Sequence, residues 1–206
     1  DCDGDRMVIV NKNGRYMENE KLIILFAKYV DAKKIVVPVD TSMILDDYIN
    51  GEIVKTRVGD IFISEKLKEI NGDFGAEASG TWTFPSFSYC PDGIFAAGMF
   101  VKMLEEMDVS KEIEKIPYYP LKRDGIMVNK KKIQDTMEKI GEEIEKFDFM
   151  NSISVDGFRI EFEDAWALIR ASGTEPKIRI TVEARETNKM EELRGEMIEL
   201  VKRCAK

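Results

Sequence analysis

The chain has 206 residues, enough for one or two compact domains, and its 44% hydrophobic and 34% charged residues are ordinary for a globular protein. A formal charge of -8 argues against a nucleic-acid partner, which normally needs a basic surface. The absence of histidine excludes any Ser-His-Asp or Cys-His catalytic arrangement within the chain, and any imidazole metal site. The apolar runs are too short to cross a bilayer, so no membrane partner is expected.

Cysteine usage gives a further expectation. Cys2, Cys90 and Cys204 are far apart and form no CxxC pair. This spacing is typical neither of a zinc site nor of a disulfide framework. We therefore expect reduced thiols and a cytoplasmic location.

The first half of the chain alternates short apolar strands with helices. Residues 7–10 and 15–17 are expected to pair around an Asn-Gly turn at 11–14. A helix is predicted over residues 20–29, with Asn19 as its N-cap. Further strands are predicted at 34–39, 52–56 and 81–84, and further helices at 43–48, 61–70 and 92–107. The alternation predicts an α/β layer with helices packed on a sheet.

The pattern changes after residue 116. Apolar residues spaced by three or four predict an amphipathic helix over 131–147. Asp156-Gly157 is a hairpin signal between strands at 152–155 and 158–162. An extended segment at 118–128, strands at 165–171 and 178–184, and a last helix capped by Asn188 complete the half. This half reads as α+β, an antiparallel sheet backed by two helices.

The opening residues form an acidic loop. Asp1, Asp3 and Asp5 alternate with other residues, and Gly4 permits the tight turn that would bring their carboxylates together. Three such carboxylates suit Mg²⁺, which takes oxygen ligands, and Arg6 would offer a forked donor to a phosphate. The alternative is an acidic surface turn without a metal. Because the sequence begins inside this loop, we expect that the N-terminal part of a longer protein is missing.

Two loops of the first half are candidate binding sites. In residues 75–81 (GAEASGT), Glu77 and Ser79 lie two apart and would point to the same side, which suits sugar hydroxyls. The alternative is a plain helix-to-strand connection. In residues 57–60 (RVGD) a helix N-terminus would attract an anion, although Asp60 is equally an ordinary N-cap.

The second half has one donor-rich loop, at residues 170–176 (RASGTEP). It is longer than a hairpin needs, and its glycine allows backbone N–H groups to converge on an anion. The expected donors are Arg170, Ser172, Gly173, Thr174 and Arg179. The loop is predicted to bind a phosphate, with a solvated turn as the alternative.

Together these loops resemble those of the α-D-phosphohexomutase superfamily. The first looks like its metal loop, DxDxDR, the second like its sugar loop, typically GGExSGH, and the third like its phosphate loop, nearly letter for letter. They occur in the family's order, and the resemblance spans essentially the whole chain. It implies that residues 1–18 end domain 2 of a four-domain enzyme, that 19–116 are its α/β domain 3, and that 117–206 are its α+β domain 4.

The resemblance also implies an activity. The family interconverts the 1- and 6-phosphates of a hexose or hexosamine through a phosphoserine and a bisphosphate intermediate, with Mg²⁺, which makes it an intramolecular phosphotransferase. By resemblance Asp1, Asp3 and Asp5 would bind Mg²⁺, with Arg6 assisting. From the residues and the resemblance together, the expected substrate-binding residues are Gly59, Asp60, Glu77, Ser79, Thr81, Arg170, Ser172, Gly173, Thr174 and Arg179.

Two departures from the family pattern matter. No serine precedes the metal loop, so we expect the N-terminal domains to hold the phosphoryl carrier and this chain alone to be inactive. Thr81 stands where the family usually has a histidine, and a threonine cannot shuttle protons near neutral pH. The glucosamine or mannose phosphate is favoured over the glucose phosphate. The alternative function is a non-catalytic phosphosugar-binding module.

Overall fold

The computed structural model describes all 206 residues. The chain divides into two compact units, Asp1–Pro117 and Tyr118–Lys206, and each has its own sheet. None of the helices combines the length and the apolar character that a membrane span requires.

The first unit is built on a mixed sheet. Its strands lie in the order β2-β1-β3-β4; β1 pairs in parallel with β2 and β3, and β4 pairs antiparallel with β3. The elements are α1 (Asn19–Tyr29), β1 (Lys34–Pro38), α2 (Ile44–Tyr48), β2 (Glu52–Thr56), α3 (Asp60–Ile70), β3 (Phe74–Ala76), β4 (Trp82–Thr83), α4 (Gly93–Glu106) and α5 (Val109–Glu114). The carboxyl ends of the parallel strands therefore share one edge, where ligand-binding loops of α/β folds gather.

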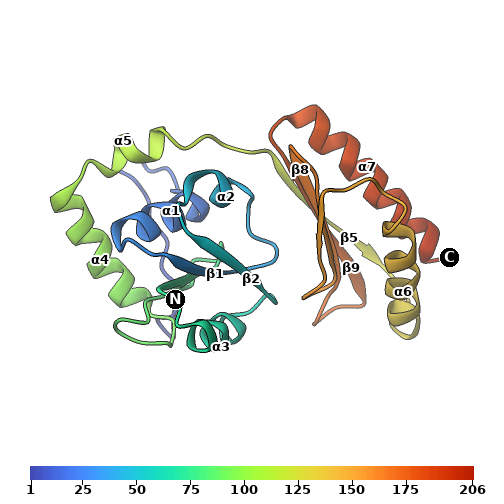
Figure 1. Cartoon of the computed structure of the whole chain (residues 1–206), viewed down its shortest axis with the longest axis horizontal. Coiled ribbons are helices and arrows are strands. Elements are labelled where there is room, and N and C mark those ends of the chain that lie inside the picture. The colour runs from blue at the N-terminus through green and yellow to red at the C-terminus, as the bar shows by residue number, and fades with distance from the viewer. The chain divides into compact units, whose positions relative to one another are not determined.

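Helices cover both faces of this sheet, with α3 on one side and α1 and α2 on the other (Figure 1). On the α1 side, Phe26 packs its ring against Phe74 and Trp82, with centroids 6.2 and 5.0 Å away. On the other face, α3 lies very close to β3: a Cβ on Gly75 of β3 would lie 2.5 Å from Ile63 Cγ2 of α3. Only glycine leaves room there for α3 to pack on β3.

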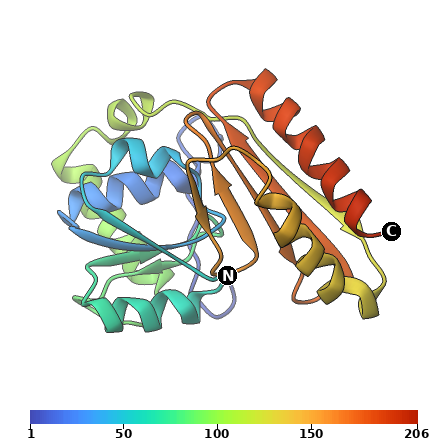
Figure 2. The same ribbon diagram turned by 45° about the vertical axis from the view of Figure 1, so that its right-hand side comes forward.

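The second unit is an antiparallel sheet backed on one face by two helices. Its strands lie in the order β5-β9-β8-β7-β6. The elements are β5 (Leu121–Met127), η1 (Lys130–Lys132), α6 (Ile133–Ile144), β6 (Asn151–Ile153), β7 (Phe158–Glu161), β8 (Ala165–Ala171), β9 (Lys177–Ala184) and α7 (Thr187–Cys204). Figure 2 shows α6 and α7 side by side on the same face, where alternate residues of β8 and β9 join their apolar residues in one core. The two predicted fold classes, a mixed α/β sheet and an antiparallel sheet backed by helices, are confirmed.

Three predicted caps are wrong. Asn19 is the first residue of α1, after an N-cap at Glu18, and its side chain is used elsewhere. Asn188 lies inside α7, whose N-cap is Glu186 and has no side-chain cap. Asp60 begins α3, whose N-cap is Gly59 at φ 132°. In each case a local capping pattern placed the helix boundary one or two residues too late.

Some short elements also differ from the expectation. Residues 7–17 pair around the Asn-Gly turn as expected, but they form no continuous strands. The pairing consists of the bridge Val10–Tyr16 and of backbone hydrogen bonds from the N–H of Asn11 to Arg15 and from the N–H of Met17 to Ile9. β3 and α5 were not predicted, because three residues and six residues give no periodic signal. The turn at Gly157 is confirmed, since its φ is +84° and it joins β6 to β7.

Candidate functional site

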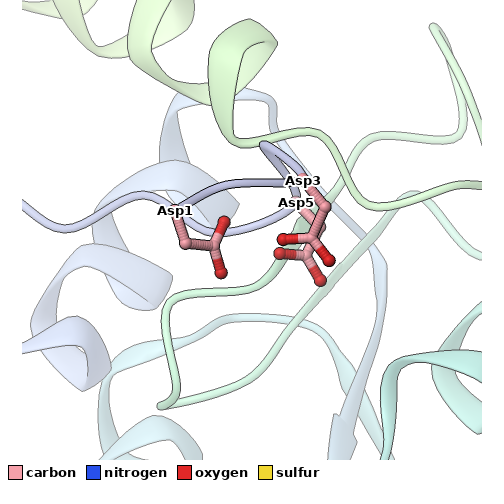
Figure 3. Close-up of side chains that lie close together, drawn as sticks. All are labelled: Asp1, Asp3 and Asp5. Atoms are coloured by element: carbon pink, nitrogen blue, oxygen red, sulfur yellow. The ribbon is translucent and has the colours of Figure 1, made fainter.

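The acidic loop brings its three carboxylates together. One oxygen from each of Asp1, Asp3 and Asp5 lies within 4.8 Å of the others. Figure 3 shows the carboxylate of Asp1 facing those of Asp3 and Asp5 across the loop. Gly4, at φ +77°, makes the turn, and its carbonyl accepts a hydrogen bond of 2.8 Å from the N–H of Gly93 at the start of α4. The loop is therefore held on the body of the first unit.

The donor set fits a hard divalent cation. All three side chains offer carboxylate oxygens, which Mg²⁺ prefers. Asp5 Oδ1 is buried and accepts no hydrogen bond, and it lies 3.6 Å from Arg6 Nε in an ion pair. A buried carboxylate oxygen without a donor is costly unless a cation binds it. Arg6 Nε also donates to Asp1, so its positive charge offsets part of the negative charge of the three carboxylates.

Glu77 and Ser79 face each other in the loop that follows β3. Ser79 Oγ donates to Glu77 Oε2 at 2.8 Å, and it lies 3.1 Å from Thr81 Oγ1. The other carboxylate oxygen, Glu77 Oε1, accepts from the backbone N–H of Gly59 at 2.9 Å. Glu77 and Ser79 therefore lie on the same side of the loop, as expected. The hydrogen bond from Gly59 also brings the loop before α3 into contact with Glu77. Ser79 is exposed, Glu77 is half-buried and Thr81 is buried.

Burial dominates the electrostatics of Glu77. Its pKa is raised above the usual range, first because the carboxylate is desolvated, and further by the charges of Asp40 and Asp60. The hydrogen bonds from Ser79 and Gly59 act in the opposite direction. Such a carboxylate gains from hydroxyl donors that replace its lost hydration. Asp60 itself is exposed at the first turn of α3.

The acidic loop (residues 1–6) and the loop at residues 75–81 are joined by backbone hydrogen bonds. Arg6 and Thr81 form an antiparallel bridge, and the N–H of Met7 donates to the carbonyl of Gly80 at 2.9 Å. The indole N–H of Trp82 donates to the carbonyl of Met7, also at 2.9 Å. The candidate metal ligands and the candidate sugar ligands therefore belong to one small assembly.

Sequence reasoning did not identify Asn19 as part of this assembly. Its Nδ2 donates to the carbonyl of Ala78 at 2.9 Å, and the residue is 1% exposed. The only signal in the sequence is a polar residue beside an apolar helix, which is also the signal of an N-cap. The contact joins residues 59 positions apart, so no local pattern reveals it.

In the second unit two arginines lie side by side near the loop that joins β8 to β9. Arg170 and Arg179 are register partners on the two strands. Arg170 Nη1 lies 3.6 Å from Asp156 Oδ2, and Arg179 Nη2 donates to Glu175 Oε2 at 3.1 Å. Like charges placed directly opposite destabilise a sheet, and the carboxylates of Asp156 and Glu175 offset this repulsion.

The loop between these strands adds polar donors. Ser172 Oγ accepts from the backbone N–H of Glu175 at 3.3 Å and from Arg179 Nε at 3.5 Å. Gly173 and Thr174 are exposed, and their N–H groups donate no hydrogen bond within the chain. Exposed N–H groups beside two guanidinium groups are donors of the kind that bind anions.

Comparison with known proteins shows what the chain resembles. Residues 18–119 match the model of the phosphoglucomutase/phosphomannomutase α/β/α domain III, and residues 125–200 match that of the C-terminal domain of the same family. The chain belongs to the α-D-phosphohexomutase superfamily. It holds the C-terminal portion of the family's fold, with domains III and IV.

Curated relatives agree with this assignment. A probable phosphoglucosamine mutase of Methanocella arvoryzae is 43% identical over 206 residues, which cover 99% of this chain and 47% of the relative. The corresponding protein of Thermococcus kodakarensis is 41% identical over 213 residues, 99% of this chain and 47% of its own length. The chain therefore spans about half the length of the curated relatives it matches.

Solved structures share the fold. A phosphoglucomutase/phosphomannomutase family protein from Burkholderia thailandensis has a TM-score of 0.86 at 23% identity, covering 98% of this chain and 45% of that one. Aspergillus fumigatus N-acetylphosphoglucosamine mutase, solved with GlcNAc-6P and magnesium, has a TM-score of 0.65 at 14% identity, covering 99% of this chain and 48% of that one. At these identities the likeness shows the fold alone.

Proposed function

We propose that this chain is the metal-, sugar- and phosphate-binding portion of a phosphohexomutase that interconverts the 1- and 6-phosphates of a hexosamine. The observation that supports this most is the joining of two motif loops: the N–H of Met7, next to the DxDxDR loop, donates at 2.9 Å to Gly80 of the GAEASGT loop. A phosphoryl group near the first loop and a sugar hydroxyl on the second would then be held in a fixed relation. Such positioning supplies much of the rate enhancement in phosphoryl transfer.

Each loop has a separate role in the proposal. Glu77 and Ser79 bind sugar hydroxyls, with Thr81 behind them and Gly59 and Asp60 beside them. Arg170, Ser172, Gly173, Thr174 and Arg179 bind the phosphate that is not being transferred. Binding this distal phosphate contributes energy that orients the reacting end of the sugar.

Asp1, Asp3 and Asp5 would hold Mg²⁺, and Arg6 would donate to the phosphate beside it. The buried oxygen of Asp5, which accepts no hydrogen bond, and the all-carboxylate donor set support this assignment. When bound, Mg²⁺ would neutralise negative charge that develops on the transferred group. By the family resemblance the phosphoryl carrier is a serine of the N-terminal domains, so the activity is proposed for the full-length protein.

The hexosamine is favoured by the names of the relatives, which are probable phosphoglucosamine mutases at 38–43% identity. The preference among glucosamine, mannose and glucose phosphates is part of the proposal. The cytoplasmic location also stays a prediction.

The test is an assay of the full-length protein, phosphorylated and supplied with Mg²⁺, against the 1-phosphates of glucosamine, mannose and glucose. We expect conversion to the 6-phosphate, fastest for glucosamine. The matched control is Asp3→Asn in the same protein, which removes one candidate metal ligand and should reduce conversion at least a hundredfold. Binding of these sugar phosphates without any interconversion would favour the phosphosugar-binding module instead.

A further inference from the structure

We infer that Asn19 is a positioning residue for the sugar loop: its side-chain amide holds the Ala78 carbonyl and thereby sets the orientation of Glu77 and Ser79. This inference rests on the proposed function, because it assigns Asn19 a role in binding the sugar. Asn19 itself is 1% exposed, so the inferred role is positioning of the loop.

The contact is specific in its geometry. Asn19 Nδ2 donates to the Ala78 carbonyl at 2.9 Å, and the side chain is 1% exposed. The Ala78 carbonyl belongs to the peptide plane that joins Ala78 to Ser79. Fixing this plane fixes the backbone on which the Ser79 hydroxyl stands, and Ser79 Oγ in turn donates to Glu77 Oε2.

The packing around Asn19 is tight on the side of the loop. Gly80 has φ +97°, and a Cβ there would lie 2.8 Å from the Met7 carbonyl and 3.4 Å from Asn19 Nδ2. The loop is therefore confined between Asn19 of α1 and the segment that follows the metal loop. The side chain forms this contact at a cost, since Asn19 Oδ1 is buried without a hydrogen-bond partner. A side chain that served only to fill space would be apolar at this position.

The test uses Asn19→Asp in the full-length protein, because the two side chains have nearly the same shape. At pH 8 the carboxylate presents an oxygen to the Ala78 carbonyl, so we expect the KM for glucosamine 1-phosphate to rise about tenfold with a smaller change in kcat. At lower pH the protonated acid can donate to the carbonyl again. The ratio of variant to wild-type KM should therefore fall toward one by about pH 5.5, since burial raises the pKa of the introduced acid. The Asn19→Ser variant, measured over the same pH range, accounts for the titration of Glu77, because it adds no new charge beside that carboxylate.

Asn19→Ser and Thr83→Val complete the design. Asn19→Ser removes the amide without adding a charge, so it should raise KM at every pH with no recovery, and it keeps the test decisive if Asn19→Asp does not fold at pH 8. Thr83→Val is the matched control, because Thr83 lies in β4 beside the loop, is 1% exposed and has a buried hydroxyl without a partner. It should leave KM unchanged.

Hydrogen exchange separates this inference from the proposed function. The N–H groups of Gly80 and Glu77 donate within the loop, at 3.0 Å each. In Asn19→Ser we expect exchange at residues 77–81 to be at least tenfold faster than in wild type or Thr83→Val. If the full-length protein proves to have no mutase activity, the proposed function fails but this measurement still decides the role of Asn19. Unchanged exchange together with a KM ratio that does not vary with pH would overturn the inference.

Discussion

Glu77 combines a proposed role in sugar binding with an electrostatic cost to the stability of the fold. Its carboxylate is half-buried and accepts hydrogen bonds from Gly59 and Ser79, and its pKa is raised chiefly by desolvation. A raised pKa means that the folded chain holds the proton to a higher pH than the unfolded chain does. The free energy of unfolding therefore declines as pH rises from about 4.5 through the folded pKa.

This combination predicts two effects of Glu77→Gln. At pH 7.5 the variant should melt at a higher temperature than the wild type, and the difference should vanish below about pH 4.5, where both side chains are neutral. The same change should weaken binding of a hexosamine phosphate by the full-length protein about 10- to 100-fold, because charge-assisted hydrogen bonds are lost. Calorimetric titration and thermal unfolding measure the two effects. Glu65→Gln on the exposed surface of α3 is the control and should change neither.

Arg179 should be decisive for phosphate binding by the second unit. It lies opposite Arg170 in the sheet, and its Nε lies 3.5 Å from Ser172 Oγ. We expect Arg179→Gln to weaken binding of inorganic phosphate about 10- to 100-fold. Arg203→Gln, which also removes an arginine paired with a glutamate, should have no effect, because Arg203 lies on α7. Titration of the 206-residue chain with phosphate compares the two. Equal losses in both variants would mean that net charge alone attracts the anion.

At the scale of elements, two glycines give opposite predictions in the same unit. A Cβ on Gly75 would collide with Ile63 and Leu67 of α3, so Gly75→Ala should lower the free energy of unfolding by about 1–3 kcal/mol. Gly98 lies in α4 with open space around its Cα, so Gly98→Ala should raise the free energy of unfolding by about 0.5–1 kcal/mol. Urea denaturation measures both. A destabilised Gly98→Ala would show that something covers this face of α4.

The ion pair between α7 and β5 contributes to the acid sensitivity of the second unit. Arg194 contacts both oxygens of Asp124, at 2.6 and 2.7 Å, and this pair holds the pKa of Asp124 below its usual range. A lowered pKa contributes stability above the unfolded pKa, near 3.9, and this stability is lost as pH falls through the lower folded value.

Asp124→Asn should therefore destabilise the unit at pH 7, by about 1 kcal/mol for a partly exposed pair, and by progressively less as the pH falls below about 4. Glu199→Gln, in a more exposed pair on the same helix, should change stability by a few tenths of a kcal/mol at most. Denaturation of both variants at pH 7 and pH 3 gives the comparison. A deficit that persists undiminished at pH 3 would contradict the assigned role of the charge.

The elements that the sequence predicts well are those with long periodic patterns. α6 and α7 follow from apolar residues at intervals of three and four, and the hairpin at Gly157 from its turn residues. β3 escaped prediction because three residues have no period, and its strand role depends on α3 packing over Gly75. Asn19 was predicted as a cap, but a distant carbonyl uses its side chain.

The candidate site divides in the same way. The three loops could be recognised as candidate sites from the sequence, because binding of a metal, a sugar or a phosphate requires particular residue types. The contacts between the loops could not be predicted. Glu77 bonds to Gly59, and Gly80 bonds to Met7, only because the folding of the sheet brings these distant segments together. The roles of these residues in binding stay predictions that the experiments above test.

At the scale of the whole molecule, the candidate metal-binding residues and the candidate phosphate-binding residues belong to different compact units. The carboxylates of Asp1, Asp3 and Asp5 lie in the first unit, and the donors around Arg179 lie in the second. A ligand stabilises the unit that binds it, by about 2.7 kcal/mol when its concentration is a hundred times the dissociation constant. We therefore expect calorimetry of the chain to show two transitions, of which Mg²⁺ raises one and inorganic phosphate the other.

The variants already described assign these transitions. Gly75→Ala should lower the melting temperature of the unit that Mg²⁺ stabilises, and Asp124→Asn that of the unit that phosphate stabilises, because each substitution lies in only one unit. Asp3→Asn should abolish the shift caused by Mg²⁺ and leave the shift caused by phosphate intact. A single transition that both ligands raise equally would mean that the chain unfolds as one cooperative body. Binding in one unit would then be linked to the stability of the other, and the two loops could no longer be treated as independent sites.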